Sequence, residues 1–156
     1  MDEERFMEEA LLLADRAAAL EEVPVGAVVV CDGKIVGRGF NSRETDKNAL
    51  YHAEIKAIDE ACRTLGGWRL HKCDLYVTME PCPMCAGAII NARIRRVIFG
   101  CRDEKAGAFG TKVDLCEGGF NHRPEIVSGV CEERCAEKLS AFFACLREKR
   151  KNSVEK

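Results

Sequence analysis

Residues 75–99 read LYVTMEPCPMCAGAIINARIRRVIF, and this stretch decides the fold. Residues 75–79 form a short apolar run with β-forming side chains, which predicts a buried strand. Pro81 occupies an early-helix position, and residues 82–92, rich in alanine, glycine and isoleucine, predict a helix. Residues 97–99 predict the next strand. Strand, helix and strand in this order are typical of a β–α–β unit.

Upstream of this unit, the sequence predicts a helix and then a hairpin. Apolar residues recur at helical spacing from Glu3 to Leu20, which predicts an amphipathic first helix. Two β-rich runs, residues 27–31 and 34–37, flank Asp32-Gly33, a dipeptide that favours the positive φ angles of a tight turn. We therefore expect an antiparallel β-hairpin here.

Two further helices and two irregular segments complete the chain. Residues 41–50 are polar and lack periodicity, so they predict a loop before a helix from about His52 to Leu65, which Gly66-Gly67 ends. The glycine-rich residues 101–123 carry no clear pattern. A final helix is expected from about Glu132 to Lys149.

The order of elements predicts the architecture. A hairpin followed by two successive β–α–β passages predicts a mixed, about five-stranded sheet with helices on both faces, a three-layer α/β/α sandwich. The chain has 156 residues, of which 47% are hydrophobic. That length suits one core, so we expect a single domain over residues 1–156, with its core at about 3–150.

Composition restricts location and partners. The apolar runs are too short to cross a bilayer, and the acidic start Met1–Arg5 has no apolar signal region, so we expect a cytoplasmic protein with no membrane partner. Ten cysteines then favour metal ligation and free thiols over disulfides. The formal net charge is −2, so nucleic-acid binding would rely on local basic groups such as Arg93–Arg96 or Arg147–Lys151.

Two short motifs carry the chemistry. His52-Ala53-Glu54 and Pro81–Cys85 each stand at the start of a predicted helix. Cys82 and Cys85 share a helix face, and a helix N-terminus favours the thiolate that binds zinc. With His52 they make three ligands for one Zn²⁺ per subunit and leave a fourth position for water, which is typical of catalytic sites. Glu54 is then the expected catalytic group, which transfers protons between that water and the substrate.

Other interpretations of these motifs remain open. A structural zinc site would recruit a fourth Cys or His, and a thioredoxin-like redox pair would use Cys82 and Cys85 without His52 or Glu54. Cys131 and Cys135 suggest a second metal site, but we expect them and the other non-ligand cysteines to be buried or partly buried free thiols.

The chain resembles the bacterial tRNA-specific adenosine deaminases of the cytidine deaminase-like superfamily. The matching segments are Glu22–Val28, Gly39–Asn41, His52–Ile55, Leu75–Cys82, Met84–Ala88, Asn121–Arg123 and Phe142-Phe143. The resemblance implies a homodimer that binds a tRNA anticodon stem-loop and converts adenosine to inosine at the wobble position.

The resemblance also implies substrate contacts. It places Asn41 and Val25 in the base pocket, and it places a further four residues near the anticodon loop. These four are Asp103, Lys105, Phe143 and Arg147. Stacking and basic groups suit a flipped base and its flanking nucleotides, although Phe143 is equally compatible with a core position on the last helix.

One segment departs from the family pattern. The family carries Asp-Pro-Thr-Ala before the His-Ala-Glu motif, whereas this chain has Asn48-Ala49-Leu50-Tyr51. A larger Tyr51 beside the ligand histidine would reshape the pocket mouth. An alternative function is therefore deamination of free nucleobases or nucleosides of the guanine or cytosine type, and a third is a zinc-stabilised interaction module without activity.

Overall fold

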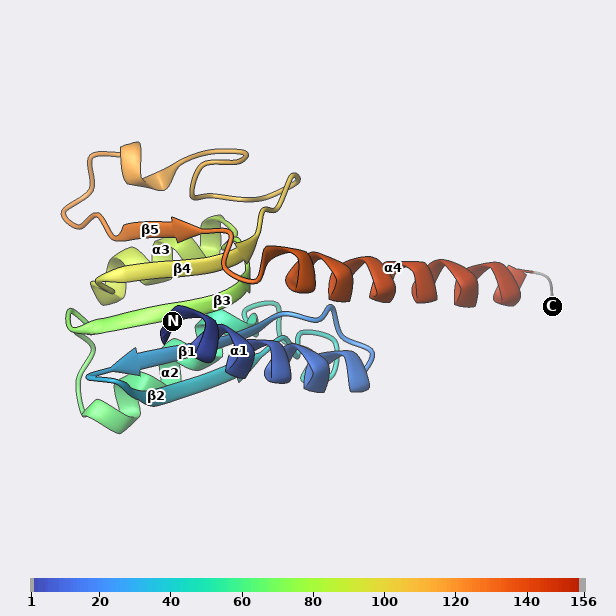
Figure 1. The fold of residues 1–156 in the computed structure, drawn as a ribbon, viewed down its shortest axis with the longest axis horizontal. Coiled ribbons are helices and arrows are strands. Elements are labelled where there is room, and N and C mark those ends of the chain that lie inside the picture. Colours follow the sequence, from blue (N-terminus) through green and yellow to red (C-terminus); the bar gives the residue numbers. More distant parts are fainter. Residues whose placement is uncertain (1, 155–156) are drawn as a thin grey trace.

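The computed structural model describes residues 2–154 and contains a five-stranded mixed sheet with four α-helices (Figure 1). The elements are α1 (Asp2–Ala19), β1 (Gly26–Cys31), β2 (Lys34–Phe40), α2 (Ala53–Leu65), β3 (Cys73–Met79), α3 (Pro83–Ala92), β4 (Arg96–Cys101), the short 3₁₀ helix η1 (Leu115–Glu117), β5 (Glu125–Ser128) and α4 (Glu132–Val154). The strand order is β2-β1-β3-β4-β5. The predicted three-layer α/β/α architecture is confirmed.

Strand directions follow from the connections. The hairpin is confirmed: β1 pairs antiparallel with β2, and Asp32 and Gly33 at its turn have φ angles of 52° and 74°. β1 also pairs antiparallel with β3, whereas β3 and β4 are parallel, as are β4 and β5. The helix α3 connects β3 to β4, which confirms the β–α–β unit.

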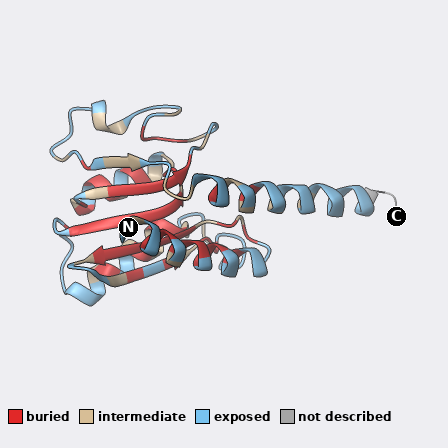
Figure 2. Ribbon diagram, viewed as in Figure 1, coloured by how far each residue is buried: buried red, intermediate tan, exposed pale blue. Residues whose placement is uncertain are grey.

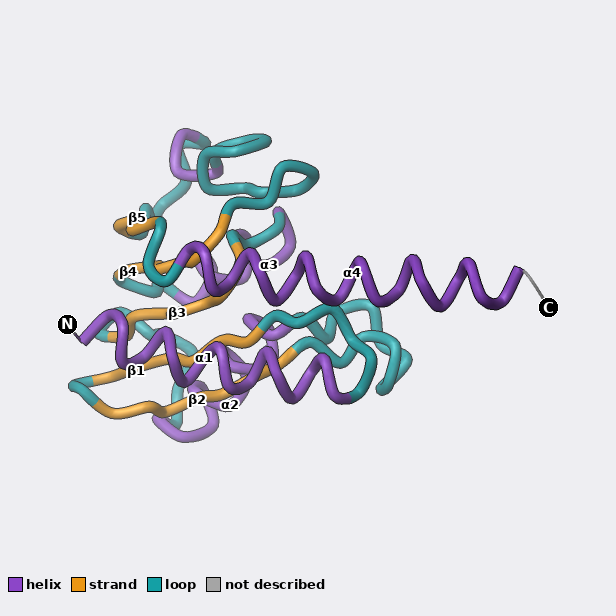
Figure 3. The backbone as a smooth tube through the Cα atoms, turned by 45° about the vertical axis from the view of Figure 1, so that its right-hand side comes forward, coloured by secondary structure: helices purple, strands orange, loops and turns teal. Residues whose placement is uncertain are grey.

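Two apolar cores lie on opposite faces of the sheet. Alternate residues of β1 contribute to each: Val28 and Val30 pack with α1 and α4, whereas Ala27 and Val29 pack with α2 and α3. The tube view shows α1 and α4 on the near side of the strands (Figure 3). In Figure 2 the strands at the centre of the sheet are buried, while the outer helix faces are exposed. The middle strands therefore have no solvent face.

Several boundaries differ from the sequence predictions. The early-helix proline is Pro83, which begins α3, while Cys82 is the N-cap and Pro81 precedes it. The strand β5 was not identified individually, because its four residues, Glu125–Ser128, have only two partly buried positions and no strong apolar run. It forms by pairing with β4, which is a contact that local sequence does not encode.

The last helix extends well beyond the sheet (Figure 1). It runs to Val154 rather than to Lys149, and Cys135 and Leu139 in its first part enter the core. From Ser140 to Ser153 its residues are exposed or half-buried. Within residues 2–154, no helix combines the length and the apolar character that crossing a membrane requires.

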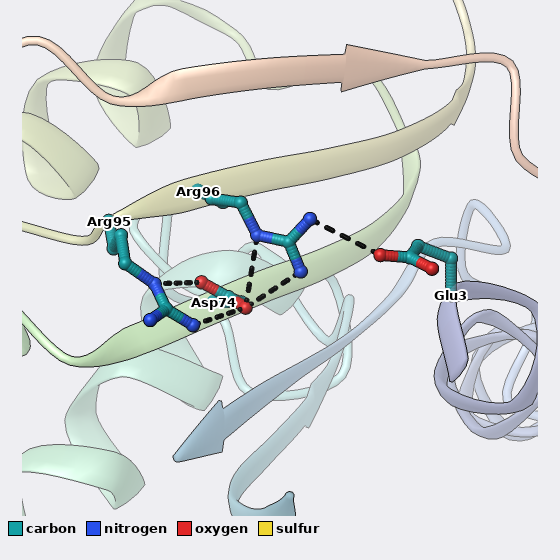
Figure 4. Close-up of polar contacts among 4 residues, drawn as sticks. All are labelled: Glu3, Asp74, Arg95 and Arg96. Carbon is teal, nitrogen blue, oxygen red and sulfur yellow. Dashed lines mark hydrogen bonds and ion pairs between the residues drawn. The ribbon is translucent and has the colours of Figure 1, made fainter. Parts of the chain in front are cut away.

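A charged cluster connects β3, β4 and α1 (Figure 4). The carboxylate of Asp74 on β3 accepts hydrogen bonds from Arg95 and Arg96, at 2.9 Å for the shortest pair in each case. Arg96 also donates to Glu3 of α1 at 3.2 Å. Because Asp74 is buried, these guanidinium groups compensate for its lost hydration.

Candidate metal centre and its cleft

Three metal-ligating atoms converge between two helix starts. His52 is the N-cap of α2, Cys82 is the N-cap of α3, and Cys85 lies in the first turn of α3. The Nδ1 atom of His52 is 3.6 Å from the Sγ of Cys82 and 3.5 Å from the Sγ of Cys85. One ligand atom from each residue lies within 4.8 Å of the others, and the described residues contain no second group of this kind. An imidazole and two thiols at this spacing fit one tetrahedral zinc ion.

The three ligand residues shift one another's pKa values. Hydrogen bonds from Cys85 and His52 lower the pKa of Cys82 to about 4, although burial opposes this. The hydrogen bond to Cys82, together with burial, raises the pKa of Cys85. The hydrogen bond to Cys82 also raises the pKa of His52. Because metal ligands bind in their deprotonated forms, cation binding releases protons from this group.

Close packing of α2 against β2 places His52 at the site. The backbone of the strand approaches the helix at Gly37 and Gly39, where an added Cβ would lie 2.8 Å from the amide nitrogen of Ala61 and 2.7 Å from that of Ala57. Both α2 and α3 pack on the same face of the sheet. Because β2 and β3 are both antiparallel to β1, they point in the same direction, and the helices that follow them begin at the same edge of the sheet. This arrangement unites ligands 30 residues apart in sequence.

Glu54 lies beside the ligand group and lines the same cleft. Its side chain is only 4% exposed, in the first turn of α2. Burial raises the pKa of Glu54 to about 7. The carboxyl group is therefore adjacent to the metal ligands and accessible from the cleft.

A cleft of about 970 Å³ opens over these residues. All six residues expected to contact substrate line it, although they come from four separate segments. They are Val25, Asn41, Asp103, Lys105, Phe143 and Arg147. The structure thus places them around the ligands, while their roles in binding stay predictions.

The outer wall of the cleft is formed by α4. Phe143 is 41% exposed, so the alternative that it is a core aromatic is wrong. Leu146, Arg147 and Arg150 line the same wall. Sequence reasoning missed the places of Leu146 and Arg150 in the cleft, although helical spacing from Phe143 and the C-terminal basic run were signals for them.

The segment before His52 is held by a buried carboxylate. Glu22 accepts hydrogen bonds from the backbone N–H groups of Glu44 and Thr45 at 3.2 and 2.6 Å. The side chain of Asn41 donates to the carbonyl of Val23 at 3.3 Å. Tyr51 is not among the described residues that line the cleft, and its ring lies 5.2 Å from the ammonium of Lys56. In this structure Tyr51 therefore packs beside Lys56 and does not line the cleft.

The non-ligand cysteines are free thiols, as expected. Cys73, Cys101 and Cys135 are buried, and four more are partly buried. Cys145 is exposed, so the expectation of burial is wrong for this residue, which lies on the projecting part of α4. No second metal group forms around Cys131 and Cys135 within the described residues.

Known proteins are similar to this chain in sequence and in fold. Residues 1–101 match the family described as the cytidine and deoxycytidylate deaminase zinc-binding region. A tRNA-specific adenosine deaminase of Bacillus subtilis (strain 168) is 51% identical over 150 residues, which cover 96% of this chain and 93% of that protein.

Solved structures agree with these matches. A structure from a study of A-to-I editing by tRNA:A34 deaminases at the wobble position has a TM-score of 0.80 and 43% identity, covering 86% of this chain and 99% of its own. A guanine deaminase of Bacillus subtilis has a TM-score of 0.62 and 33% identity, covering 72% and 83%. The His52, Cys82 and Cys85 group fits the zinc ion of such a domain. The chain therefore belongs to the tRNA-specific adenosine deaminase family, within the proteins that carry the cytidine and deoxycytidylate deaminase zinc-binding region.

Proposed function

We propose that this protein converts adenosine to inosine at the wobble position of a tRNA anticodon. The observation that carries the proposal is one cleft that joins a His52/Cys82/Cys85 group and a buried Glu54 to basic and aromatic side chains on its rim. The B. subtilis relative named for this activity matches almost the whole chain.

His52, Cys82 and Cys85 would hold the zinc ion. The ion supplies a Lewis acid that activates water at neutral pH. Cys82 would bind it as a thiolate and His52 as a neutral imidazole, and their ligand atoms already lie 3.6 Å apart. The third ligand, Cys85, is fully buried and fixes the depth of the site.

Glu54 is the proton-transfer residue in this proposal. As a water oxygen adds to C6 of adenine, a carboxylate oxygen of Glu54 takes a proton from that water and gives it to N1 of the ring. Glu54 then transfers the second proton of that water, which is now on the oxygen bound to C6, to the exocyclic nitrogen. The C6–N bond breaks, and ammonia leaves. Its position in the cleft beside the ligands supports this role.

The rim residues suit a single-stranded anticodon loop. Phe143 offers an exposed ring on which a splayed-out base can stack, and Lys105 and Arg147 offer positive charge to phosphates. In this proposal Val25 and Asn41 contact the flipped adenine in the cleft. The amide of Asn41 is oriented by two backbone contacts, because it donates to the carbonyl of Val23 and accepts from the N–H of Arg43.

A test of the function uses zinc-loaded protein and an arginine tRNA with adenosine at the wobble position. We expect inosine to form there. Glu54→Gln should retain zinc and lose activity by a factor of about 10² to 10⁴, because general acid–base catalysis contributes on that scale. Absence of inosine with zinc fully loaded would contradict the proposal, and unchanged activity in Glu54→Gln would contradict the role of Glu54.

The free-base alternative predicts a different product. The guanine deaminase neighbour shares the fold, but at 33% identity it matches less closely than the adenosine deaminase relative at 51%. Ammonia release from guanine, cytosine and their nucleosides, with no turnover of the tRNA, would favour the alternative over our proposal.

We also propose that the protein works as a homodimer in the cytoplasm, where its tRNA substrate occurs. The family resemblance supports the dimer. Light scattering of the purified protein should give twice the mass of the 17.3 kDa chain. A monomer at micromolar concentration would contradict the dimer but not the deaminase activity.

A further inference from the structure

Glu80 lies two residues before Cys82, in the segment that leads from β3 into α3. Its carboxylate is 2% exposed and faces the loop that follows β4. Oε1 accepts from the backbone N–H of Asp103 at 3.2 Å and from the hydroxyl of Thr111. Oε2 accepts from the backbone N–H groups of Phe109 and Thr111 at 3.1 and 3.2 Å. The loop 103–111 is thus folded around one carboxylate.

This loop carries part of the cleft wall. Asp103, Glu104 and Lys105 line the cleft. The Oδ1 atom of Asp103 accepts from the backbone N–H groups of Lys105 and Ala106 at 3.0 and 3.2 Å. A chain of contacts therefore runs from Glu80 through the backbone of Asp103 to the turn that presents Lys105.

The packing leaves little freedom around this carboxylate. A Cβ added at Gly107 would meet the Glu80 carboxylate and would lie 2.6 Å from the carbonyl oxygen of Asp103. The N–H of Ala108 donates to the carbonyl of Pro81 at 2.9 Å, so the loop is also tied to the residue after Glu80. The loop is consequently held at both ends by the segment that leads into the metal-binding helix.

We propose that Glu80 is a positioning residue for RNA: it fixes the 103–111 loop so that Lys105 is presented at the cleft, and it does not act in the chemical step. This inference rests on the proposed function. Because Glu80 acts on backbone donors, its contribution should be to RNA binding, whereas the zinc ligands and Glu54 should be unaffected by its loss.

Glu80→Gln gives a specific expectation. Both carboxylate oxygens receive backbone N–H donors, which cannot reverse direction, whereas the Thr111 hydroxyl at Oε1 can. The new amide nitrogen therefore replaces Oε1, where it faces the N–H of Asp103. The hydrogen bond from Asp103 is lost and the two at Oε2 remain. Thr111→Val is the matched control, since it removes only the hydroxyl.

Amide hydrogen exchange tests the positioning without any substrate. In Glu80→Gln, we expect exchange at Asp103 and Lys105 to accelerate at least tenfold, while α3 amides and zinc content stay as in the wild type. In Thr111→Val, exchange at Asp103 should stay near the wild-type rate. Unchanged exchange at Asp103 in Glu80→Gln, or loss of zinc, would overturn the proposal.

Kinetics with an anticodon stem-loop RNA test the consequence. We expect Glu80→Gln to raise KM about fivefold to tenfold with kcat within about twofold, and to have little effect on KM in a Lys105→Ala background, because coupled residues are not additive. Additive effects on KM, or a fall in kcat alone, would overturn the proposal. If wild-type protein does not deaminate the RNA, the proposed function fails, and the exchange result still decides whether Glu80 holds the loop.

A second variant covers the case in which Glu80→Gln does not fold. Gly107→Ala perturbs the same contacts from the loop side and leaves the Glu80 side chain in place. It should give the same rise in exchange at Asp103 and the same rise in KM with zinc retained. Wild-type exchange and KM in folded Gly107→Ala would count against the proposal.

Discussion

Four carboxyl groups among the described residues are buried, those of Glu22, Glu54, Asp74 and Glu80, and their hydrogen-bond donors differ. The donors to Glu22 and Glu80 are backbone N–H groups and one hydroxyl, whereas the donors to Asp74 are two guanidinium groups. Burial opposes ionisation of Asp74 and Glu22, but their hydrogen bonds outweigh it and lower both pKa values. For Glu54 burial outweighs the hydrogen bonds that oppose it and raises the pKa to about 7. The carboxyl group with the raised pKa is thus the one beside the metal site.

Because of the charged cluster at Asp74, the free energy of unfolding should decrease as the pH becomes acidic. Because the pKa of Asp74 is lower in the folded state, the stabilisation is complete above its unfolded pKa of about 3.9 and is lost as pH falls through the folded pKa. Asp74→Asn should lower the free energy of unfolding by about 1.5–3 kcal/mol at pH 7, and the difference from wild type should shrink as the pH falls below about 3.9. Urea unfolding at a series of pH values measures this.

The control for this prediction is an exposed ion pair. Asp59 pairs with Arg63 one turn away on α2, with both side chains mostly exposed. Asp59→Asn should change the free energy of unfolding by less than about 0.5 kcal/mol at any pH. A difference for Asp74→Asn that persists undiminished at pH 2 would show that its effect does not come from the ionised carboxylate.

At the scale of elements, the distance between α2 and β2 determines where the metal ligands meet. Gly37 and Gly39 on β2 permit backbone contact with α2. His52 is the N-cap of that helix, so the position of α2 also sets the position of His52. A substitution at either glycine should therefore lower both the free energy of unfolding and the affinity for zinc, although neither glycine touches the ligands.

Gly39→Ala tests this coupling. The new Cβ would lie 2.7 Å from the amide nitrogen of Ala57 and 2.9 Å from the Cβ of Lys56, so α2 must shift outward. We expect a loss of about 1–3 kcal/mol in the free energy of unfolding together with weaker zinc binding, measured by competition with a chelator. Gly87→Ala is the control: it adds a Cβ to an exposed position of α3 with nothing within 4 Å, and should leave stability equal or higher.

At the scale of the whole molecule, the cleft carries charges of both signs. Four acidic residues line it, and they are Glu54, Glu80, Asp103 and Glu104. Four basic residues also line it, and they are Arg43, Lys105, Arg147 and Arg150. Two of these lie on α4 beyond the part that packs on the sheet, so the projecting helix brings positive charge to the cleft (Figure 1).

This distribution predicts a salt-dependent interaction with RNA. The KM for tRNA should rise with salt, and Arg147→Ala should reduce the slope of log KM against log salt concentration by about 1, the effect of one phosphate contact. Lys72→Ala, in an exposed turn outside the cleft, should leave the slope unchanged. Equal slopes for wild type and Arg147→Ala would mean that Arg147 makes no phosphate contact.

The sequence by itself determined those features that are encoded over a few residues. The β-rich run of β1, the turn at Asp32-Gly33 and the Cys82/Cys85 spacing each indicate a local geometry, and all three were predicted correctly. The pairing of His52 with the two cysteines was also predictable, because the ligand chemistry of zinc restricts the partners.

Only the tertiary structure decided the features that depend on distant segments. The strand β5 exists through its pairing with β4, Phe143 is exposed because α4 projects past the sheet, and Glu80 binds a loop whose donors lie 23 to 31 residues away. In each case, the neighbouring residues in the sequence are compatible with more than one structural environment for the segment or side chain. The choice among them follows from which backbone donors and apolar surfaces the folded chain brings within contact, and such long-range contacts leave no periodic signal in the sequence.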